Sequence, residues 1–275
     1  TGWSPDDRVH ASLPGTQRGF AIDDGGRVAA TNGLEHQWSQ DAAIEAYVRD
    51  GTVVVKRVAD DVSVTLPPGF ERVTHENGGL ELSPCGRYVA FATRGAESAL
   101  WIWAPFAKAE PVLVEQRWVS AFTWDPASRY LAVATASRVE LVDPRNGRVV
   151  DACEVVRANA LAFDAKGALL AIADVRLQVQ LWSIAEGRSI GTLSGHADRI
   201  RSLDWHPDGK RLASVGNDAR LRLWDTQSNV LALELPLDTR AFAVRWHRDG
   251  QRLCTVSDSG TVTFFDARRS YAAPR

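Results

Sequence analysis

Short stretches of alternating apolar and polar residues, separated by turn sequences, run along most of the chain. The clearest stretch covers residues 195–225, GHADRIRSLDWHPDGKRLASVGNDARLRLWD, where a Pro-Asp-Gly turn and an Asn-Asp turn separate three segments of period two. Period-two alternation is typical of strands that bury one face, and Pro, Asp, Asn and Gly favour turns. The pattern predicts three consecutive antiparallel strands joined by tight turns.

The same pattern returns after about forty residues, a period that indicates a repeat architecture. Trp246 follows Trp205 by 41 positions (246 − 205 = 41), and Gly250 keeps the same offset from Gly209. A polar connection and a fourth short strand are expected after each third strand. The chain divides into seven units, whose first strands are expected to end at Trp3, Trp38, Leu82, Trp124, Phe163, Trp205 and Trp246.

Seven units of four strands predict an all-β fold, a seven-bladed β-propeller of four-stranded antiparallel blades. We expect a single domain over residues 1–275, with blades at approximately 1–31, 32–70, 71–115, 116–153, 154–193, 194–235 and 236–275. Only nine residues follow Asp266 (275 − 266 = 9), so the terminal blade is expected to be incomplete. Either Tyr271–Ala273 form a poor fourth strand, or the last blade has three.

Three motifs of the sixth unit carry a resemblance to a known family. They are Gly195-His196, the Trp-His-Pro-Asp-Gly turn at 205–209 and Leu223-Trp224-Asp225. Together they resemble the signature of WD-repeat β-propellers. The resemblance covers the whole chain but is specific in this unit alone. The stretch 83–103, SPCGRYVAFATRGAESALWIW, suits other bacterial-type propeller repeats equally well, so the chain is similar to a divergent, bacterial-type member.

His196, Ser214 and Asp218 have the residue types of a base, a nucleophile and an orienting acid. The WD-repeat resemblance implies another role, a structural tetrad in which these three residues and Trp224 hydrogen-bond in series inside the blade. No GxSxG nucleophile elbow precedes a helix-like stretch, as a hydrolase of that class would require. We therefore expect no catalytic residues, and we expect that the protein is not an enzyme.

Composition, charge and cysteine spacing indicate which classes of partner to exclude and which cellular compartment to expect. The net charge of −2 and the pI of about 6.3 argue against a nucleic-acid partner. The apolar stretch 168–173 is far shorter than the ~20 residues of a membrane-spanning helix, and the first ten residues carry no secretory signal pattern, so no membrane association and a cytoplasmic location are expected. The three cysteines form no CxxC pair and are expected to be reduced.

No cofactor or metal is expected. A phosphate loop has no matching Gly-rich motif between a strand and a helix. His206 and His247 occupy equivalent turn positions in adjacent units, where exposure beside the Asp-Gly turns is expected. A metal site needs ligands at helical or turn spacing, which the six histidines do not offer: His10, His36, His75, His196, His206 and His247.

The resemblance to WD-repeat propellers also implies where a partner binds: at the start of each first strand and at the turn that joins the second and third strands. The second set of positions comprises Asn217, Asp258, Arg49 and Glu97. The partner-binding residues expected from the first set are Arg199, Arg201, Arg240, Phe242, Arg157, Trp118, Asn159 and Glu76. Arginine and aromatic side chains are the composition of binding hot spots.

The most consistent function is a non-catalytic protein–protein interaction scaffold, a monomeric propeller within a complex, whose narrow face binds an acidic segment of another protein. Arginine pairs carboxylates bidentately, and Trp118 or Phe242 would receive an apolar anchor. One alternative is that these arginines are solvated rim residues neutralised by nearby aspartates. Another is an enzyme or small-ligand-binding propeller that uses the central channel, for which Glu76 would be the single inner acid.

Overall fold

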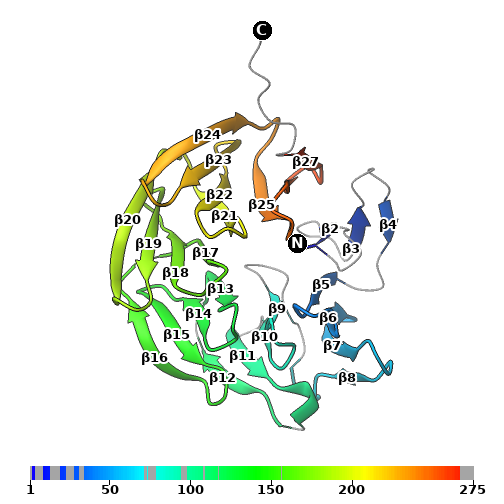
Figure 1. The fold of residues 1–275 in the computed structure, drawn as a ribbon. Coiled ribbons are helices and arrows are strands. Elements are labelled where there is room, and N and C mark those ends of the chain that lie inside the picture. Colours follow the sequence, from blue (N-terminus) through cyan, green and yellow to red (C-terminus); the bar gives the residue numbers. More distant parts are fainter. Residues whose placement is uncertain are drawn as a thin grey trace. The chain divides into compact units, whose positions relative to one another are not determined.

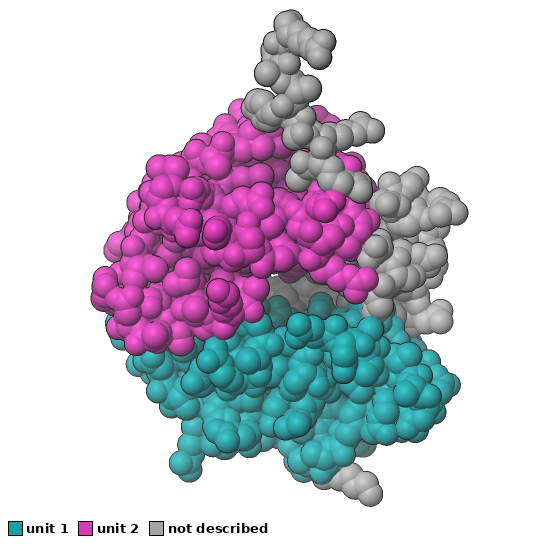
Figure 2. All heavy atoms as spheres, in the orientation of Figure 1, with its two compact units in different colours: residues 1–161 teal, residues 162–275 magenta. Residues whose placement is uncertain are grey.

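In the computed structural model, the chain consists of two compact units, residues 1–161 and residues 162–275 (Figure 2). Up to residue 36, only the backbone is described. The described residues are 2–3, 9–12, 19–22, 28–30, 34–70, 73, 79–93, 98–107, 109–116, 118–155 and 157–266.

The first unit contains four antiparallel sheets of four strands each, formed by strands that are consecutive in the sequence (Figure 1). One short 3-10 helix, η1 (Pro105–Ala107), precedes β12. The strands are β1 (Gly2–Trp3), β2 (Val9–Ser12), β3 (Gly19–Ile22), β4 (Val28–Ala30), β5 (Leu34–Trp38), β6 (Ile44–Arg49), β7 (Thr52–Arg57), β8 (Ser63–Thr65), β9 (Leu80–Leu82), β10 (Val89–Thr93), β11 (Ala99–Trp103), β12 (Val112–Glu115), β13 (Ala121–Trp124), β14 (Leu131–Ala134), β15 (Val139–Asp143) and β16 (Arg148–Cys153).

Three further sheets follow, and the first strand of the first of them contains the boundary between the two units. Two of these sheets have four strands, and the last has three within the described residues. The strands are β17 (Ala160–Phe163), β18 (Leu169–Ala173), β19 (Gln178–Ser183), β20 (Arg188–Ser194), β21 (Ile200–Trp205), β22 (Arg211–Gly216), β23 (Arg220–Asp225), β24 (Val230–Pro236), β25 (Ala241–Trp246), β26 (Arg252–Ser257) and β27 (Val262–Asp266).

The repeat read from the sequence matches the sheets. Each of the seven anchor residues is the last residue of the first strand of a sheet, so the expected repeat of small antiparallel sheets is confirmed. The terminal sheet, β25–β27, has three strands among the described residues. The segment Tyr271–Ala273, considered as its fourth strand, lies outside the described residues.

Apolar side chains of neighbouring sheets form the core. In the second unit, Val215 and Leu221 pack with Val244, Trp246 and Leu253 of the next sheet. The strands alternate because one face of each sheet meets its neighbour, and burying apolar area contributes about 25 cal/mol per Å². Neither sheet can bury this face alone, so packing between sheets stabilises both.

The turns after the first strands of the last two sheets are tight and also make contact with each other. Gly209 and Gly250 have φ values of 70° and 67°, a left-handed conformation that favours glycine. His206 lies against the second of these turns, with Nε2 2.9 Å from the Gly250 carbonyl oxygen. A Cβ added to Gly250 would lie 2.7 Å from His206 Nε2, so this turn has no space for a side chain.

The expectation that His206 and His247 are exposed is wrong. They are 6% and 3% exposed, respectively. His206 packs edge-on against Trp246, with ring centroids 4.7 Å apart, and its Nδ1 accepts the backbone N–H of Asp208. Contacts with the neighbouring sheet therefore bury a ring that would be open to solvent in an isolated unit.

Candidate functional site

A buried chain of polar side chains crosses the sheet β21–β24. Trp224 Nε1 donates to Ser214 Oγ at 2.8 Å, and Ser214 Oγ lies 2.7 Å from His196 Nε2. The other ring nitrogen, Nδ1 of His196, lies 2.9 Å from Asp218 Oδ2. The structure thus brings all four predicted tetrad residues into one hydrogen-bonded series that spans β22, β23 and the two loops beside them.

Two residues that sequence reasoning missed extend this series. Arg222 Nη1 donates to Asp218 Oδ2 at 2.6 Å, and Arg222 Nη2 pairs with Glu234 Oε2 of β24 at 2.8 Å. Arg222 is buried, and its register partner on β22 is Ser214. The signal available in the sequence was a cation two positions before Trp224 on the same face of the strand.

The protonation states follow from burial and from these contacts. Burial lowers the pKa of His196, against the opposing effect of Asp218, so its neutral form is favoured. Burial raises the pKa of Asp218, but hydrogen bonds from Arg222 and from the Ala197 N–H outweigh it, and the net pKa is lowered. The series therefore holds a carboxylate beside a neutral imidazole.

The Ser-His-Asp order of this series does not make it reactive. Ser214 is 0% exposed, and its Oγ accepts the indole N–H of Trp224 while it contacts His196. A nucleophile needs access to a reacting carbonyl, and this hydroxyl has no solvent-facing surface. What the arrangement can do is tie the loop before β21 to the turn between β22 and β23, through the bond from the Ala197 N–H to Asp218 Oδ2 at 3.1 Å.

The expected partner-binding residues of the second unit lie at one end of its sheets, where β21 and β25 begin. We call this the first-strand end. The two strands lie side by side, since Val244 N–H donates to Ser202 Oγ at 3.2 Å and Trp246 N–H to Asp204 Oδ2 at 2.6 Å. Both strands therefore begin at the same end of the unit (Figure 1).

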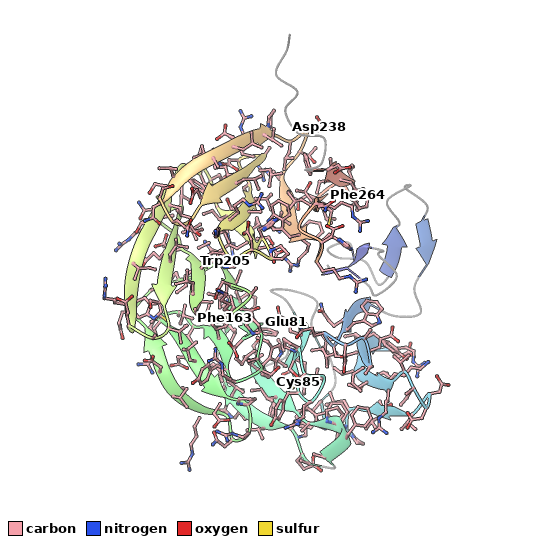
Figure 3. The ribbon with its side chains drawn as sticks, viewed as in Figure 1. Glu81, Cys85, Phe163, Trp205, Asp238 and Phe264 are labelled. Atoms are coloured by element: carbon pink, nitrogen blue, oxygen red, sulfur yellow. The ribbon has the colours of Figure 1, made fainter. Side chains whose placement is uncertain are left out.

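Four predicted residues meet there. Arg199 and Arg240 precede the two strands and are exposed, whereas Arg201 is exposed on β21 and Phe242 is half-buried on β25. Asp238, labelled in Figure 3, belongs to the loop that leads into β25. The structure brings the four side chains to one surface of the unit.

The turns between second and third strands reach the same surface. Asn217 N–H donates to the Arg199 carbonyl at 2.9 Å, and Asp258 N–H donates to the Arg240 carbonyl at 3.0 Å. These two identical bonds fix each turn against the start of a first strand, so both sets of expected positions lie together in this unit.

The pairing of the arginines at the first-strand end differs from that at the turns on the opposite end of the sheets. Among the described residues, no hydrogen bond or ion pair reaches the guanidinium groups of Arg199 and Arg240. At the opposite turns, Arg211 pairs with Asp208 at 2.8 Å, and Arg252 pairs with Asp249 at 3.0 Å. Burial raises the pKa of Asp208, but hydrogen bonds from the Lys210 backbone N–H and from Arg211 outweigh it, and the pKa is lowered to about 2. Unpaired arginines thus gather at the first-strand end.

Trp118, Arg157 and Asn159 belong to the first unit and are described within it. Ser120 Oγ donates to the Ala158 carbonyl at 2.6 Å, so the segment after Trp118 meets the segment that contains Arg157 and Asn159. Trp118 is 53% exposed, a large exposed aromatic side chain. Arg157 is also exposed and Asn159 is half-buried, and the structure brings these three near one another.

The remaining positions are less informative. Glu76 and Glu97 lie outside the described residues. Arg49 is exposed near the Tyr47 ring, 6.0 Å from its centroid. Within the described ranges, no group of three or more His, Cys, Asp or Glu residues could hold a metal ion. No helix in the described part of the chain has the length and apolar character needed to cross a membrane.

Sequence reasoning missed two exposed residues in an equivalent turn. Val175 occupies in the turn β18–β19 the position that Asn217 occupies in the turn β22–β23 (217 − 175 = 42), and it is 50% exposed. Arg176 follows it, and its guanidinium has no partner among the described residues. The constant repeat offset was the signal that could have identified both.

Comparisons with known proteins agree with this architecture. The family model "WD domain, G-beta repeat" matches residues 187–225 and 238–266. An uncharacterized WD repeat-containing protein of Synechocystis is 35% identical over 117 residues, covering 41% of this chain and 33% of the relative. The nuclear distribution protein nudF of Emericella nidulans is 27% identical over 190 residues, covering 68% of this chain and 37% of the relative.

Further similarities concern a shorter stretch and the fold. Rat coronin-7 is 39% identical over 79 residues, covering 29% of this chain and 8% of the relative. The chain thus spans less than two fifths of the length of these relatives. A chain in the crystal structure of a mitotic checkpoint complex aligns with a TM-score of 0.75 at 20% identity, covering 96% of this chain and 85% of that one. The repeats, the sheets and these similarities together show that the chain contains WD repeats, matched over residues 187–225 and 238–266, and that it has a β-propeller fold.

Proposed function

We propose that this protein is a non-catalytic scaffold that binds a segment of a partner protein at the first-strand end of its sheets. The observation that carries the proposal is the set of exposed arginines at this end without an acidic partner among the described residues, Arg199 and Arg240 above all. An exposed arginine without an ion pair costs the folded protein little free energy, because water solvates it, and it remains available to a ligand of opposite charge.

The partner that fits this surface is an acidic, carboxylate-bearing segment. Guanidinium groups bind carboxylates through two parallel hydrogen bonds, which gives direction as well as affinity. Phe242 offers an apolar contact beside Arg201, and Trp118 offers one in the first unit. Arginine and tryptophan are the residue types that most often dominate the energy of protein interfaces.

The proposal extends to the remaining properties of the chain. The seven sheets form one domain that acts as a monomeric propeller within a complex, in the cytoplasm, without nucleic acid or cofactor. The burial of Ser214 supports a non-catalytic role, since the nearest arrangement to a catalytic triad has no access to a substrate.

The experiment is affinity capture from the source cell with quantitative mass spectrometry, comparing the wild type with the triple variant Arg199→Ala, Arg201→Ala, Trp118→Ala. We expect the variant to lose the captured partner and to keep its thermal unfolding temperature, because the three side chains are exposed. A matched control replaces exposed residues of the outer strands, Arg148→Ala, Val150→Ala and Arg188→Ala, and should capture as the wild type does. Equal capture by the first triple variant would refute the proposal.

A further inference from the structure

Three residues whose side chains carry hydrogen-bond donors, Arg199, Arg201 and Asn217, lie where β21 begins. Arg201 Nη1 donates to Asn217 Oδ1 at 3.3 Å, and the Asn217 backbone is bonded to the Arg199 carbonyl. Because the amide oxygen of Asn217 takes the guanidinium N–H, its Nδ2 is left as a donor. No partner among the described residues uses this Nδ2 or the Arg199 guanidinium, so both can donate to a ligand.

Two carboxylates lie next to these residues in the sequence, Asp198 and Asp218. Asp218 follows Asn217 but points inward, with its side chain 5% exposed and held by Arg222 and His196. Asp198 Oδ1 accepts the backbone N–H of Arg199 at 2.6 Å, and no ion pair with the guanidinium is found within the described ranges. The Arg199 guanidinium therefore forms no ion pair with either of these two carboxylates of the described part of the chain.

The last sheet offers a natural comparison at the same backbone positions. Counting 41 residues onward, Arg240 replaces Arg199, Phe242 replaces Arg201, and Asp258 replaces Asn217. The bond from the turn to the first strand is the same in both sheets, since Asp258 N–H donates to the Arg240 carbonyl. A carboxylate ligand would meet three donors at the first set, whereas at the second set it would meet one arginine, a phenyl ring and a repelling carboxylate.

We propose that Arg199, Arg201 and Asn217 form a carboxylate-binding subsite, which takes the side chain of an aspartate or glutamate in the partner segment, while Phe242 contacts the apolar part of that segment. The inference rests on the proposed function and assigns its acidic anchor to one sheet. A carboxylate has two acceptor oxygens with room for the fork of an arginine and an amide N–H together.

The probe for this subsite is a fluorescein-labelled hexaglutamate peptide, with hexaglutamine of the same length as the neutral control. Binding to the full 275-residue chain is followed by fluorescence anisotropy at low salt, because exposed charge pairs are screened by salt. We expect hexaglutamate to bind and hexaglutamine not to bind.

The decisive variants exchange the two equivalent turn residues. Asn217→Asp should weaken hexaglutamate binding by at least about fivefold, as should Arg199→Ala, because each removes a donor and the first also adds a repelling charge. Asp258→Asn should bind at least as tightly as the wild type, since it removes an exposed negative charge. The Asn217→Asp turn is expected to fold, because the sequence already carries aspartate at the equivalent Asp258; an unchanged unfolding temperature checks this.

Wild-type affinity in Asn217→Asp, or equal binding of hexaglutamine, would overturn the subsite. The two proposals fail separately. A chain that captures a cellular partner without binding hexaglutamate contradicts the subsite alone. A chain that binds hexaglutamate through these residues but captures no partner contradicts the scaffold and leaves the subsite in place.

Discussion

At the scale of single residues, two tryptophans in equivalent positions differ in their hydrogen bonding. Trp224 Nε1 donates to Ser214 Oγ, whereas Trp182 Nε1 is buried without a partner among the described residues. The register explains the difference, because Ser214 pairs with Arg222 on β23 and its equivalent, Ile172, pairs with Gln180 on β19. Isoleucine has no hydrogen-bond acceptor. The indole N–H of Trp182 therefore loses its bond to water on folding and gains no replacement among the described residues.

We expect Trp224→Phe to destabilise the protein by about 1–2 kcal/mol more than Trp182→Phe. Both changes lose the same ring atoms, but only the first breaks a buried hydrogen bond, while the second removes an unsatisfied donor. Urea unfolding followed by circular dichroism compares the two variants. An equal loss of stability would show that the series around His196 contributes nothing beyond packing.

Asp204 is a second residue whose environment predicts a measurable effect. Removal from solvent raises the pKa of Asp204 to about 6, against Arg245 and the backbone N–H groups of Trp246 and Trp205. A folded-state pKa above that of the unfolded chain means that stability is highest where the group is protonated and falls as pH rises through about 6.

The variant Asp204→Asn should remove this pH dependence. Its unfolding free energy relative to the wild type should rise by about 2 kcal/mol between pH 4 and pH 7, because the amide keeps the hydrogen bond to Trp246 N–H without a charge. Denaturant unfolding of both proteins across this range is the measurement. Parallel pH profiles would mean that the Asp204 carboxylate is well solvated.

At the scale of elements, the turns after the first strands act as contacts between sheets as well as connections. Gly250, in such a turn, and Gly187, in the turn between β19 and β20, have similar φ values of 67° and 60°, but their surroundings differ. A Cβ on Gly250 would meet the His206 ring at 2.7 Å, whereas a Cβ on Gly187 would meet nothing within 4 Å. The two glycines therefore separate backbone strain from packing between sheets.

Gly250→Ala should destabilise the protein by at least about 1 kcal/mol more than Gly187→Ala. The left-handed conformation costs about the same in both, and the remainder comes from displacing the buried His206 ring and its contact with the Gly250 carbonyl. Thermal unfolding of the pair is the check. Equal shifts in unfolding temperature would contradict a packing role for this turn.

The sequence predicted the elements well and the contacts between them poorly. The repeat of about forty residues and the anchor residue of each unit located the end of every first strand, because strand alternation and turn residues are local properties. The burial of His206 and the pairing of Arg222 with Glu234 could not be read in this way. Both depend on which side chains of another strand or sheet lie opposite, and the repeat offset does not give this information.

The candidate site was predictable in part for the same reason. The repeat register gives the positions Arg199, Arg201 and Arg240, but their lack of acidic partners depends on where Asp198 and Asp218 direct their carboxylates. The carboxylate of Asp218 is buried against Arg222 and His196, so it does not pair with the exposed arginines. The amide of Asn217 became relevant only once its bond to Arg201 was known.

At the scale of the whole molecule, the WD repeats and the propeller fold supply an array of similar sheets that differ in their exposed residues. The buried series around His196 holds two loops, and the same loops carry Arg199 and Asn217 toward solvent. A fold of this kind does not by itself determine a function, so the exposed residues that differ from repeat to repeat must do so.

Under the proposed function, a partner protein contacts the ends where the first strands begin. Hydrogen-exchange mass spectrometry of the chain with and without its captured partner tests this most directly. We expect slower exchange at residues 157–159, 199–201, 217 and 240–242, and no change in the outer strands β20 and β24. Protection confined to those outer strands, or to the opposite turns at 206–209 and 247–250, would contradict the claim.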